Sequence, residues 1–187
     1  VDFYVGFSKN MGIHAAWNVA LTLAESEYFV TCDNDLLAPN LEPDWLSRME
    51  SIMDANPNYG AISMHPHIFI GAAGIDPAVP DDVVERNMCG AVFRIMRTQA
   101  VRDCGGWLHQ IEPGRNHEER TICSQLQTAG FKVGITPHIR AYHLFGDNWG
   151  YPEEFTPQMQ KHNPELKDYV KQFDQIEGYN PDTWLPK

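Results

Sequence analysis

The sequence predicts one α/β domain, a layered fold in which helices cover a sheet. Short apolar, β-prone segments alternate along the chain with segments whose apolar residues recur at helical spacing. The chain has 187 residues, of which 43% are hydrophobic and 21% are charged. This is the size and composition of a single globular domain, and it excludes collagen-like, disordered and disulfide-scaffold proteins.

The first part of the chain contains three predicted strands that alternate with two helices. Residues 1–6 are apolar and β-prone, and residues 14–25 repeat apolar side chains at helical spacing. A short buried-strand pattern follows at residues 27–32. Residues 43–55 have one apolar face and a proline in the first turn, which predicts a helix, and residues 59–64 form another strand.

The rest of the chain continues this alternation after a long excursion. Residues 65–87 are interrupted by Pro and Gly and then become acidic, which predicts a surface loop. The remaining predicted strands are at 89–96, 131–135 and 139–144. The remaining predicted helices are a short one from Thr98, one at 116–129 with Gly130 as its C-cap, and one at 164–173.

The charge and the cysteines exclude several function classes. A formal net charge of -11 argues against nucleic acid as the main partner, because such proteins concentrate Lys and Arg to neutralise phosphates. The four cysteines form no CxxC pair, so we interpret them as reduced packing residues. No apolar run has the ~20 residues of a membrane span, and the start lacks the features of a signal peptide. We expect a soluble, cytoplasmic protein, and peripheral association with a membrane stays open.

A pair of carboxylates follows the strand at residues 27–32. Asp33 and Asp35 belong to the same side of an extended chain, because side chains i and i+2 face one way. At the carboxyl end of a strand they are placed to hold one hard cation, of the Mg²⁺ or Mn²⁺ type, on the phosphates of a ligand. About one Asp-x-Asp is expected by chance at this Asp content, so the position after the strand carries the hypothesis.

Further motifs follow in a fixed order along the chain. They are Asn10-x-Gly12, Asn18, Asp33-Asn34-Asp35, Gly90, Gly105-Gly106-Trp107, Glu118-Glu119, Ala129-Gly130, Pro137 and His143. Over about residues 3–146, this series resembles the GT-A glycosyltransferases, specifically the large inverting family 2. Each motif alone is weak, and the order makes the resemblance specific. It implies a Rossmann-like, nucleotide-diphospho-sugar transferase fold with a mixed sheet between helices.

The resemblance assigns roles in donor binding. Asp33 and Asp35 would bind the divalent metal on the diphosphate of a nucleotide-sugar, and His143 would be a third metal ligand. The donor itself would meet Asn10, Gly12, Asn18, Asp33, Asn34, Gly106 and Trp107. The residues alone allow other readings: Asn10 and Gly12 as turn formers, Asn18 as a polar residue on a helix face, Trp107 as a core side chain and His143 as a packed one.

Glu118-Glu119 matches the acidic dipeptide that supplies the catalytic base in the family. Counting back from Ala129 makes Glu119 the equivalent of the base. The usual second residue is Asp, so the longer Glu leaves Glu118 as an alternative base. Another reading is structural, since Asn116 as N-cap and Glu119 three residues later form a capping-box pattern.

The implied reaction is a direct displacement that inverts the anomeric carbon, with an acceptor hydroxyl as nucleophile. Residues 1–146 would be the catalytic core, and residues 147–187 a lid and a C-terminal helical extension. In the family, two further strands with their helices precede the segment that matches the start of this chain. We therefore expect an N-terminally truncated GT-A fold. The sugar, the nucleotide, the acceptor and the oligomeric state stay open.

Two other functions compete with this interpretation. His65-Pro66-His67 with Asp33, Asp35 and His143 would make a zinc site of a hydrolase, because mixtures of His and carboxylates suit Zn²⁺. The second competitor is a non-catalytic module that binds sugars or a partner, built on a remnant of the GT-A fold.

Overall fold

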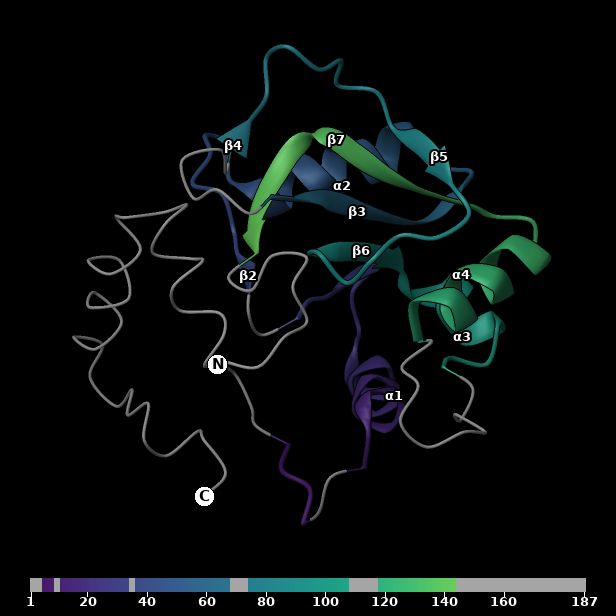
Figure 1. Cartoon of the computed structure of the whole chain (residues 1–187). Coiled ribbons are helices and arrows are strands. Elements are labelled where there is room, and N and C mark those ends of the chain that lie inside the picture. Colours follow the sequence, from purple (N-terminus) through teal and green to yellow (C-terminus); the bar gives the residue numbers. More distant parts are fainter. Residues whose placement is uncertain (1–4, 9–10, 34–35, 68–73, 108–117, 144–187) are drawn as a thin grey trace.

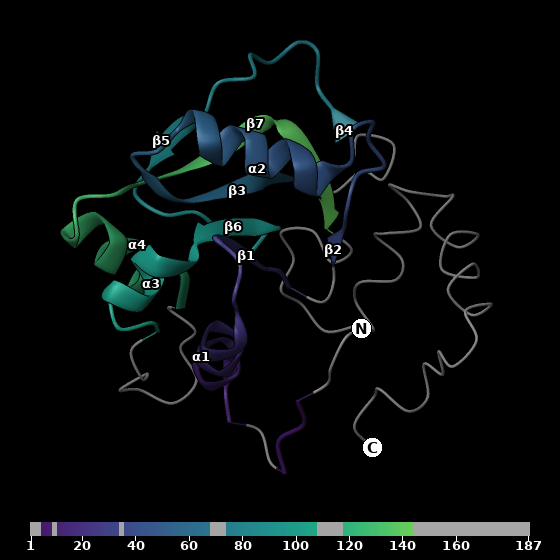
Figure 2. The same cartoon turned by 180° about the vertical axis from the view of Figure 1, so that it is seen from behind.

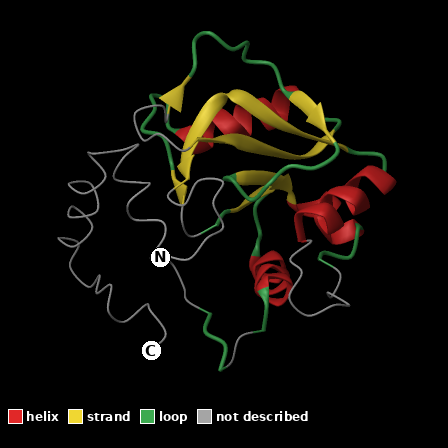
Figure 3. Ribbon diagram, in the orientation of Figure 1, coloured by secondary structure: helices red, strands yellow, loops and turns green. Residues whose placement is uncertain are grey.

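The computed structural model describes residues 5–8, 11–33, 36–67, 74–107 and 118–143. Within these residues a sheet of seven strands lies between helices (Figures 1 and 3). The predicted α/β class with a mixed sheet flanked by helices is confirmed. The predicted unit 147–187, with its helix at 164–173, lies outside the described residues, as does most of the predicted strand 1–6.

The sheet mixes parallel and antiparallel pairs. Its order is β1-β6-β3-β7-β2, and β4 and β5 also pair with β7. Only β3 and β7 are parallel, and all other described pairs are antiparallel. The strands are β1 (Tyr28–Thr31), β2 (Leu36–Leu37), β3 (Tyr59–His67), β4 (Gly74–Ile75), β5 (Val84–Arg86), β6 (Arg94–Arg97) and β7 (Lys132–His143).

In the part of the chain that the structure describes, four helices pack around this sheet: α1 (Ile13–Leu23), α2 (Trp45–Ala55), α3 (Thr98–Asp103) and α4 (Glu118–Thr128). α2 begins after Asp44, whose carboxylate accepts hydrogen bonds from the backbone N–H groups of Leu46 and Ser47. The helix therefore begins two residues later than predicted, and Pro43 precedes the N-cap instead of lying in the first turn. α4 ends before Gly130, whose φ of 92° is the left-handed conformation that the predicted C-cap requires.

The sheet separates two hydrophobic clusters, because successive side chains of a strand point to opposite faces. Ala61 of β3 and Met96 of β6 face the cluster shared with α1, α3 and α4. Their neighbours Ile62 and Ile95 face the cluster shared with α2. α2 thus covers one face of the sheet, while the other three helices cover the opposite face (Figure 2). Among the helices formed by described residues, none has the length and apolarity of a membrane span.

Several predicted strand assignments are wrong. β3 continues to His67, and the predicted surface loop also contains β4 and β5, because backbone in this excursion pairs with the long strand β7. β7 replaces the two strands predicted on either side of Pro137. The pairing of β3 with β7 shifts register beyond Thr136, so Pro137 lies at an irregularity where its missing N–H breaks no ladder.

β6 begins at Arg94 rather than at residue 89. The segment 89–93, here called the 89–93 bend, adopts no regular structure, and Phe93 within it has a φ of 44°. The backbone carbonyl of Val92 accepts from the N–H of Met64 on β3, and the other described backbone contacts of the bend are to elements outside the sheet ladder. These contacts build the candidate site.

Candidate functional site

The 89–93 bend connects three segments that carry predicted site residues. The backbone N–H of Ala91 donates to Oε1 of Glu119 on α4, at 3.3 Å. The carbonyl of the same residue accepts from the backbone N–H of Asp33, which follows β1, at 3.1 Å. One peptide segment therefore joins the strand end that carries the predicted metal ligand to the helix that carries the predicted base.

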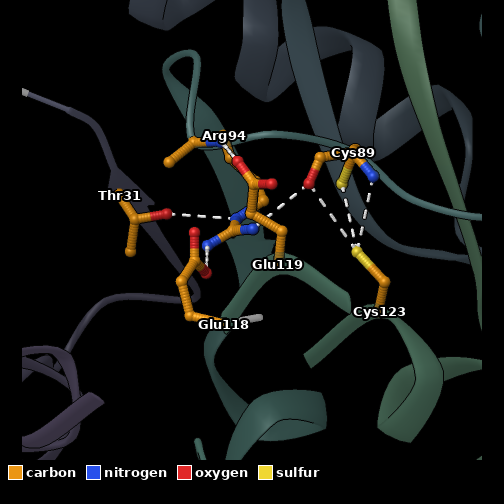
Figure 4. Close-up of polar contacts among 7 residues, drawn as sticks. Thr31, Cys89, Arg94, Glu118, Glu119 and Cys123 are labelled. Carbon is orange, nitrogen blue, oxygen red and sulfur yellow. Dashed lines mark hydrogen bonds and ion pairs between the residues drawn. The ribbon is translucent and has the colours of Figure 1, made fainter. Parts of the chain in front are cut away.

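Arg94, the first residue of β6, lies between these segments and contacts each of them (Figure 4). Its Nε donates to Oγ1 of Thr31 at 3.1 Å, and its Nη1 donates to the carbonyl of Cys89 at 3.2 Å. Its Nη2 forms an ion pair with Oε2 of Glu118 at 3.3 Å. The guanidinium carbon also lies 5.1 Å from the ring centroid of Trp17 on α1. Arg94 is 0% exposed, so each of these contacts is made away from water.

Glu118 is buried together with Arg94, since 5% of its surface is exposed. Burial raises the pKa of Glu118 from 4.5 to about 7, and the Arg94 guanidinium partly offsets this effect. The charges of Glu119 and Asp33 raise the same pKa further. The charges of Asp33 and Glu119 therefore both act on the ionisation of Glu118.

The two adjacent glutamates occupy different environments. Glu118 contacts the buried Arg94, whereas Glu119 is partly exposed and contacts the 89–93 bend. Gly90 makes room for this contact, because a Cβ at that position would lie 3.2 Å from Oε1 of Glu119. The capping-box reading needs Asn116, which lies outside the described residues. The described hydrogen bond of Glu119 is to the bend.

Asn18 fixes the turn that contains Gly106 and Trp107. Its Nδ2 donates to the carbonyl of Trp107 at 2.7 Å, and its Oδ1 accepts from the backbone N–H of Trp107 at 2.8 Å. A Cβ on Gly106 would lie 2.4 Å from that Oδ1, and the φ of Gly106 is 69°. Because Gly106 has no side chain, the Asn18 amide fits against it. The nitrogen and the oxygen of this amide are both hydrogen-bonded to the backbone of Trp107.

The ring of Trp107 lies in the core, which is the alternative that the sequence left open. The residue is 1% exposed. Its ring centroid lies 5.3 Å from that of Trp17 and 6.0 Å from that of Phe29. Protein side chains thus contact the ring that was a candidate for stacking on a sugar.

The backbone brings the predicted metal-binding segments together. Leu36, the residue after Asp35, pairs with His143 between β2 and β7. His67 pairs with Tyr142 between β3 and β7. Asn10, Asn34 and Asp35 lie outside the described residues, as do the side chains of His67 and His143.

The chemistry of the ligand atoms and the register of the strands show whether these residues suit a metal ion. Carboxylate oxygens are the ligands that Mg²⁺ and Mn²⁺ prefer. Asp33 follows the end of β1 and comes three residues before β2, the short strand that pairs with β7. Among side chains that the structure describes, no group of three His, Cys, Asp or Glu residues is close enough to hold a metal. The zinc alternative has one described imidazole, that of His65 on β3.

Gly12 is the remaining described residue that was predicted to contact the nucleotide-sugar donor, and it is the N-cap of α1. Its φ is 78°, which a residue with a side chain rarely adopts. The turn-forming reading of this glycine therefore matches the described backbone.

The sequence reasoning missed Arg94, Thr31 and Ala91. Arg94 had a detectable signal, since an arginine inside an apolar strand pattern requires a buried partner, and carboxylates are its usual ones. Thr31 and Ala91 had no such signal. Thr31 acts through a hydroxyl that every threonine carries, and Ala91 acts through its backbone, which the residue type does not reveal.

Comparison with known proteins places this fold. No family model matches the sequence, and no curated protein matches it. Among solved structures, the mannosyltransferase PcManGT from Pyrobaculum calidifontis, in complex with GDP-Man and Mn²⁺, is similar with a TM-score of 0.56 and 16% identity, over 94% of this chain and 47% of that one. GalNAc-T7, solved with UDP, GalNAc and Mn²⁺, is similar with a TM-score of 0.57 and 12% identity, over 93% of this chain and 39% of that one.

These matches define the class of the fold. The chain has the fold of GT-A-type glycosyltransferases, and it spans less than half of the length of these two structures. At 12–16% identity the likeness concerns the fold, so activity must be argued from the site of this chain.

The contact between Asn18 and Gly106 predicts an order of stabilities. Gly106→Ala should lower the free energy of unfolding by about 1–3 kcal/mol more than Gly105→Ala, because overpacking adds to backbone strain only at Gly106. Gly105 is the matched control, since it also has a positive φ, of 84°, but nothing lies within 4 Å of its missing Cβ. Urea denaturation measures both. In an Asn18→Ala background the difference should shrink to what the tight approach of Leu21 leaves, and an undiminished difference would contradict the proposed contact.

The raised pKa of Glu118 predicts a pH dependence of stability. Between about pH 4.5 and about pH 7 the folded state holds a proton that the unfolded state has released, so the free energy of unfolding falls as the pH rises. The contribution is at most about 3 kcal/mol, at roughly 1.4 kcal/mol per pKa unit. Glu118→Gln should remove it, as measured by denaturation across this pH range without divalent cations. The exposed Glu50→Gln should retain it, and equal slopes in the two variants would contradict the assignment.

Proposed function

We propose that this chain is the catalytic part of a glycosyltransferase, which transfers a sugar from a nucleotide-diphospho-sugar to an acceptor hydroxyl. The observation that carries the proposal is the double contact of Ala91 with Glu119 and with the backbone of Asp33. This contact holds a candidate base beside a candidate metal ligand within a GT-A fold. The two structural neighbours are named as complexes with Mn²⁺ and with a nucleotide or nucleotide-sugar, which supports the same class of donor.

We assign the metal to Asp33 and Asp35, with His143 as a third ligand. Mn²⁺ or Mg²⁺ bound there would neutralise negative charge on the diphosphate of the leaving nucleotide. The net charge of -11 fits a protein that meets phosphate through a cation rather than through basic side chains. Asn10, Gly12, Asn18, Asn34, Gly106 and Trp107 remain predicted for the donor side of the site. Asn18, Gly106 and Trp107 would act there by shaping the turn.

We assign the catalytic base to Glu119, and Glu118 remains the alternative. Glu119 is partly exposed, so a substrate hydroxyl can approach its carboxylate. Glu118 is paired with a buried guanidinium, which leaves it less available to a substrate. As an acceptor hydroxyl attacks the anomeric carbon, Glu119 would take its proton, and the bond to the nucleoside diphosphate would break.

The proposed stereochemistry is inversion, because a single attack occurs on the face opposite the leaving group. We also propose that residues 1–146 form the catalytic core and that residues 147–187 supply a lid and a C-terminal extension. The competing proposal is a non-catalytic module that binds sugars or a partner, and its distinguishing property is nucleotide-sugar binding without turnover.

A screen of nucleotide-sugar donors with Mn²⁺, read out as donor hydrolysis or transfer, tests this function. Asp35→Ala and Glu119→Gln should each lower turnover by about 100-fold or more, because each removes a group that acts in the transition state. Donor binding, measured by calorimetry, should survive in Glu119→Gln and be lost in Asp35→Ala. Both this chain and any longer protein that contains it should be assayed.

Glu50→Gln is the matched control, since it makes the same chemical change on the exposed side of α2. It should leave turnover and binding unchanged. Full turnover in Glu119→Gln, or turnover that is independent of divalent cations, would contradict the assigned roles. Retention of the anomeric configuration, read from the product by NMR, would contradict the single displacement.

A further inference from the structure

Two buried cysteines lie side by side behind the candidate site. Sγ of Cys89 is 3.8 Å from Sγ of Cys123, although 34 residues separate them in the sequence. Cys89 is in the 89–93 bend and Cys123 is on α4, and both are buried and unbridged (Figure 4). The remaining cysteines, Cys32 and Cys104, are exposed and partly buried, respectively.

The contacts of the pair are those of a polarised dithiol. The backbone N–H of Cys89 donates to Sγ of Cys123 at 3.4 Å, and the Cys123 thiol also faces the Cys89 carbonyl at 3.7 Å. The hydrogen bond with Cys89 lowers the pKa of Cys123 to about 7, and the Arg94 charge contributes. The same hydrogen bond, together with burial, raises the pKa of Cys89 well above its ordinary value. The backbone N–H of Cys89 donates to Sγ of Cys123, which favours the thiolate at Cys123, and a thiolate is the form that reacts with oxidants.

An oxidant can reach this pair through the bend. Cys89 directly follows Asn87 and Met88, which are both exposed, and the bend adopts no regular secondary structure. The hydrogen bonds of the bend to Asp33, Met64 and Glu119 are made by Ala91 and Val92. A peroxide is about the size of water, so a small opening of the bend would admit it. Larger disulfide reagents would require a wider opening.

We propose that Cys89 and Cys123 are a reversible redox modification site, at which a peroxide of low molecular weight converts the two thiols into an intrachain disulfide. The Cys123 thiolate attacks one peroxide oxygen, the O–O bond breaks, and a sulfenic acid and one water form with the thiol proton. The Cys89 sulfur then attacks the Cys123 sulfur, the S–O bond breaks, and a second water leaves with the second thiol proton. Two electrons pass from the two sulfurs to the peroxide. A dithiol reductant reverses the step by thiol exchange.

The disulfide would change the candidate site through the bend. The two sulfurs must approach from 3.8 Å to about 2.05 Å, which draws Cys89 toward α4. Ala91, two residues later, contacts Glu119 and the backbone of Asp33, so the contraction acts on the base and on the strand end that carries the metal ligand. This consequence rests on the proposed function, whereas the modification itself does not.

Peptide mapping tests the modification without any assay of activity. Cleavage by trypsin gives a peptide 87–94 that contains Cys89 and a peptide 121–132 that contains Cys123. The other two cysteines are in different peptides. After treatment with hydrogen peroxide, peptides 87–94 and 121–132 should appear linked, with a mass loss of about 2 Da that a dithiol reductant reverses. The variant Cys32→Ser/Cys104→Ala, which retains the pair alone, should give the same monomeric product.

The wild type and Cys123→Ser complete the test. Oxidation of the exposed Cys32 in the wild type verifies that the peroxide was effective. Cys89 and Cys123 that stay reduced at that dose, or that gain oxygen without a cross-link, would overturn the proposal. In a preparation with turnover, the cross-link should lower it at least several-fold in the wild type while Cys123→Ser is unaffected. Unchanged turnover in cross-linked protein would overturn only the coupling to the site.

Discussion

The buried guanidinium of Arg94 is the interaction on which the candidate site depends. It contacts the end of β1 through Thr31, the 89–93 bend through the Cys89 carbonyl, α4 through Glu118 and α1 through Trp17. A cation without access to water requires every one of its donors to be satisfied. In other proteins, removing one partner of such a pair costs about 3–5 kcal/mol. This cost restricts how far the four segments can move relative to one another, and three of them carry the candidate site.

The same pairing separates the roles of two adjacent carboxylates. Glu118 compensates the buried charge of Arg94, and burial raises the pKa of Glu118 to about 7. Glu119 is left partly exposed, and the N–H of Ala91 orients it. The carbonyl of Ala91 holds the backbone of Asp33 on the other side. The proposed base and the proposed metal ligand are 86 residues apart in the sequence, and both are contacted by the backbone of one residue, Ala91. The dithiol of Cys89 and Cys123 involves the same bend.

Much of this arrangement can be predicted from the sequence. The rest cannot be predicted, and the reasons are physical. Helical periodicity and a C-cap glycine predicted α1 and α4, and the order of motifs predicted the GT-A fold. Local patterns could not reveal that residues 65–87 supply two strands to β7, because pairing between distant segments leaves little local signal. The contribution of Ala91 is made by its backbone, which no residue type encodes. The side chain of Trp107 is a core residue in a motif that also suited a sugar platform, and burial alone distinguishes the two.

We have proposed that Asp33, the 89–93 bend and Glu119 surround a single site for a metal-bound nucleoside diphosphate. Paramagnetic broadening of amide NMR signals by Mn²⁺, added with UDP or GDP, measures this most directly. We expect the strongest broadening at Asp33, Ala91 and Glu119 and only in the presence of nucleotide, with the signals of α2 retained. Broadening that centres instead on the acidic residues Asp81 and Asp82, or that is the same without nucleotide, would contradict it.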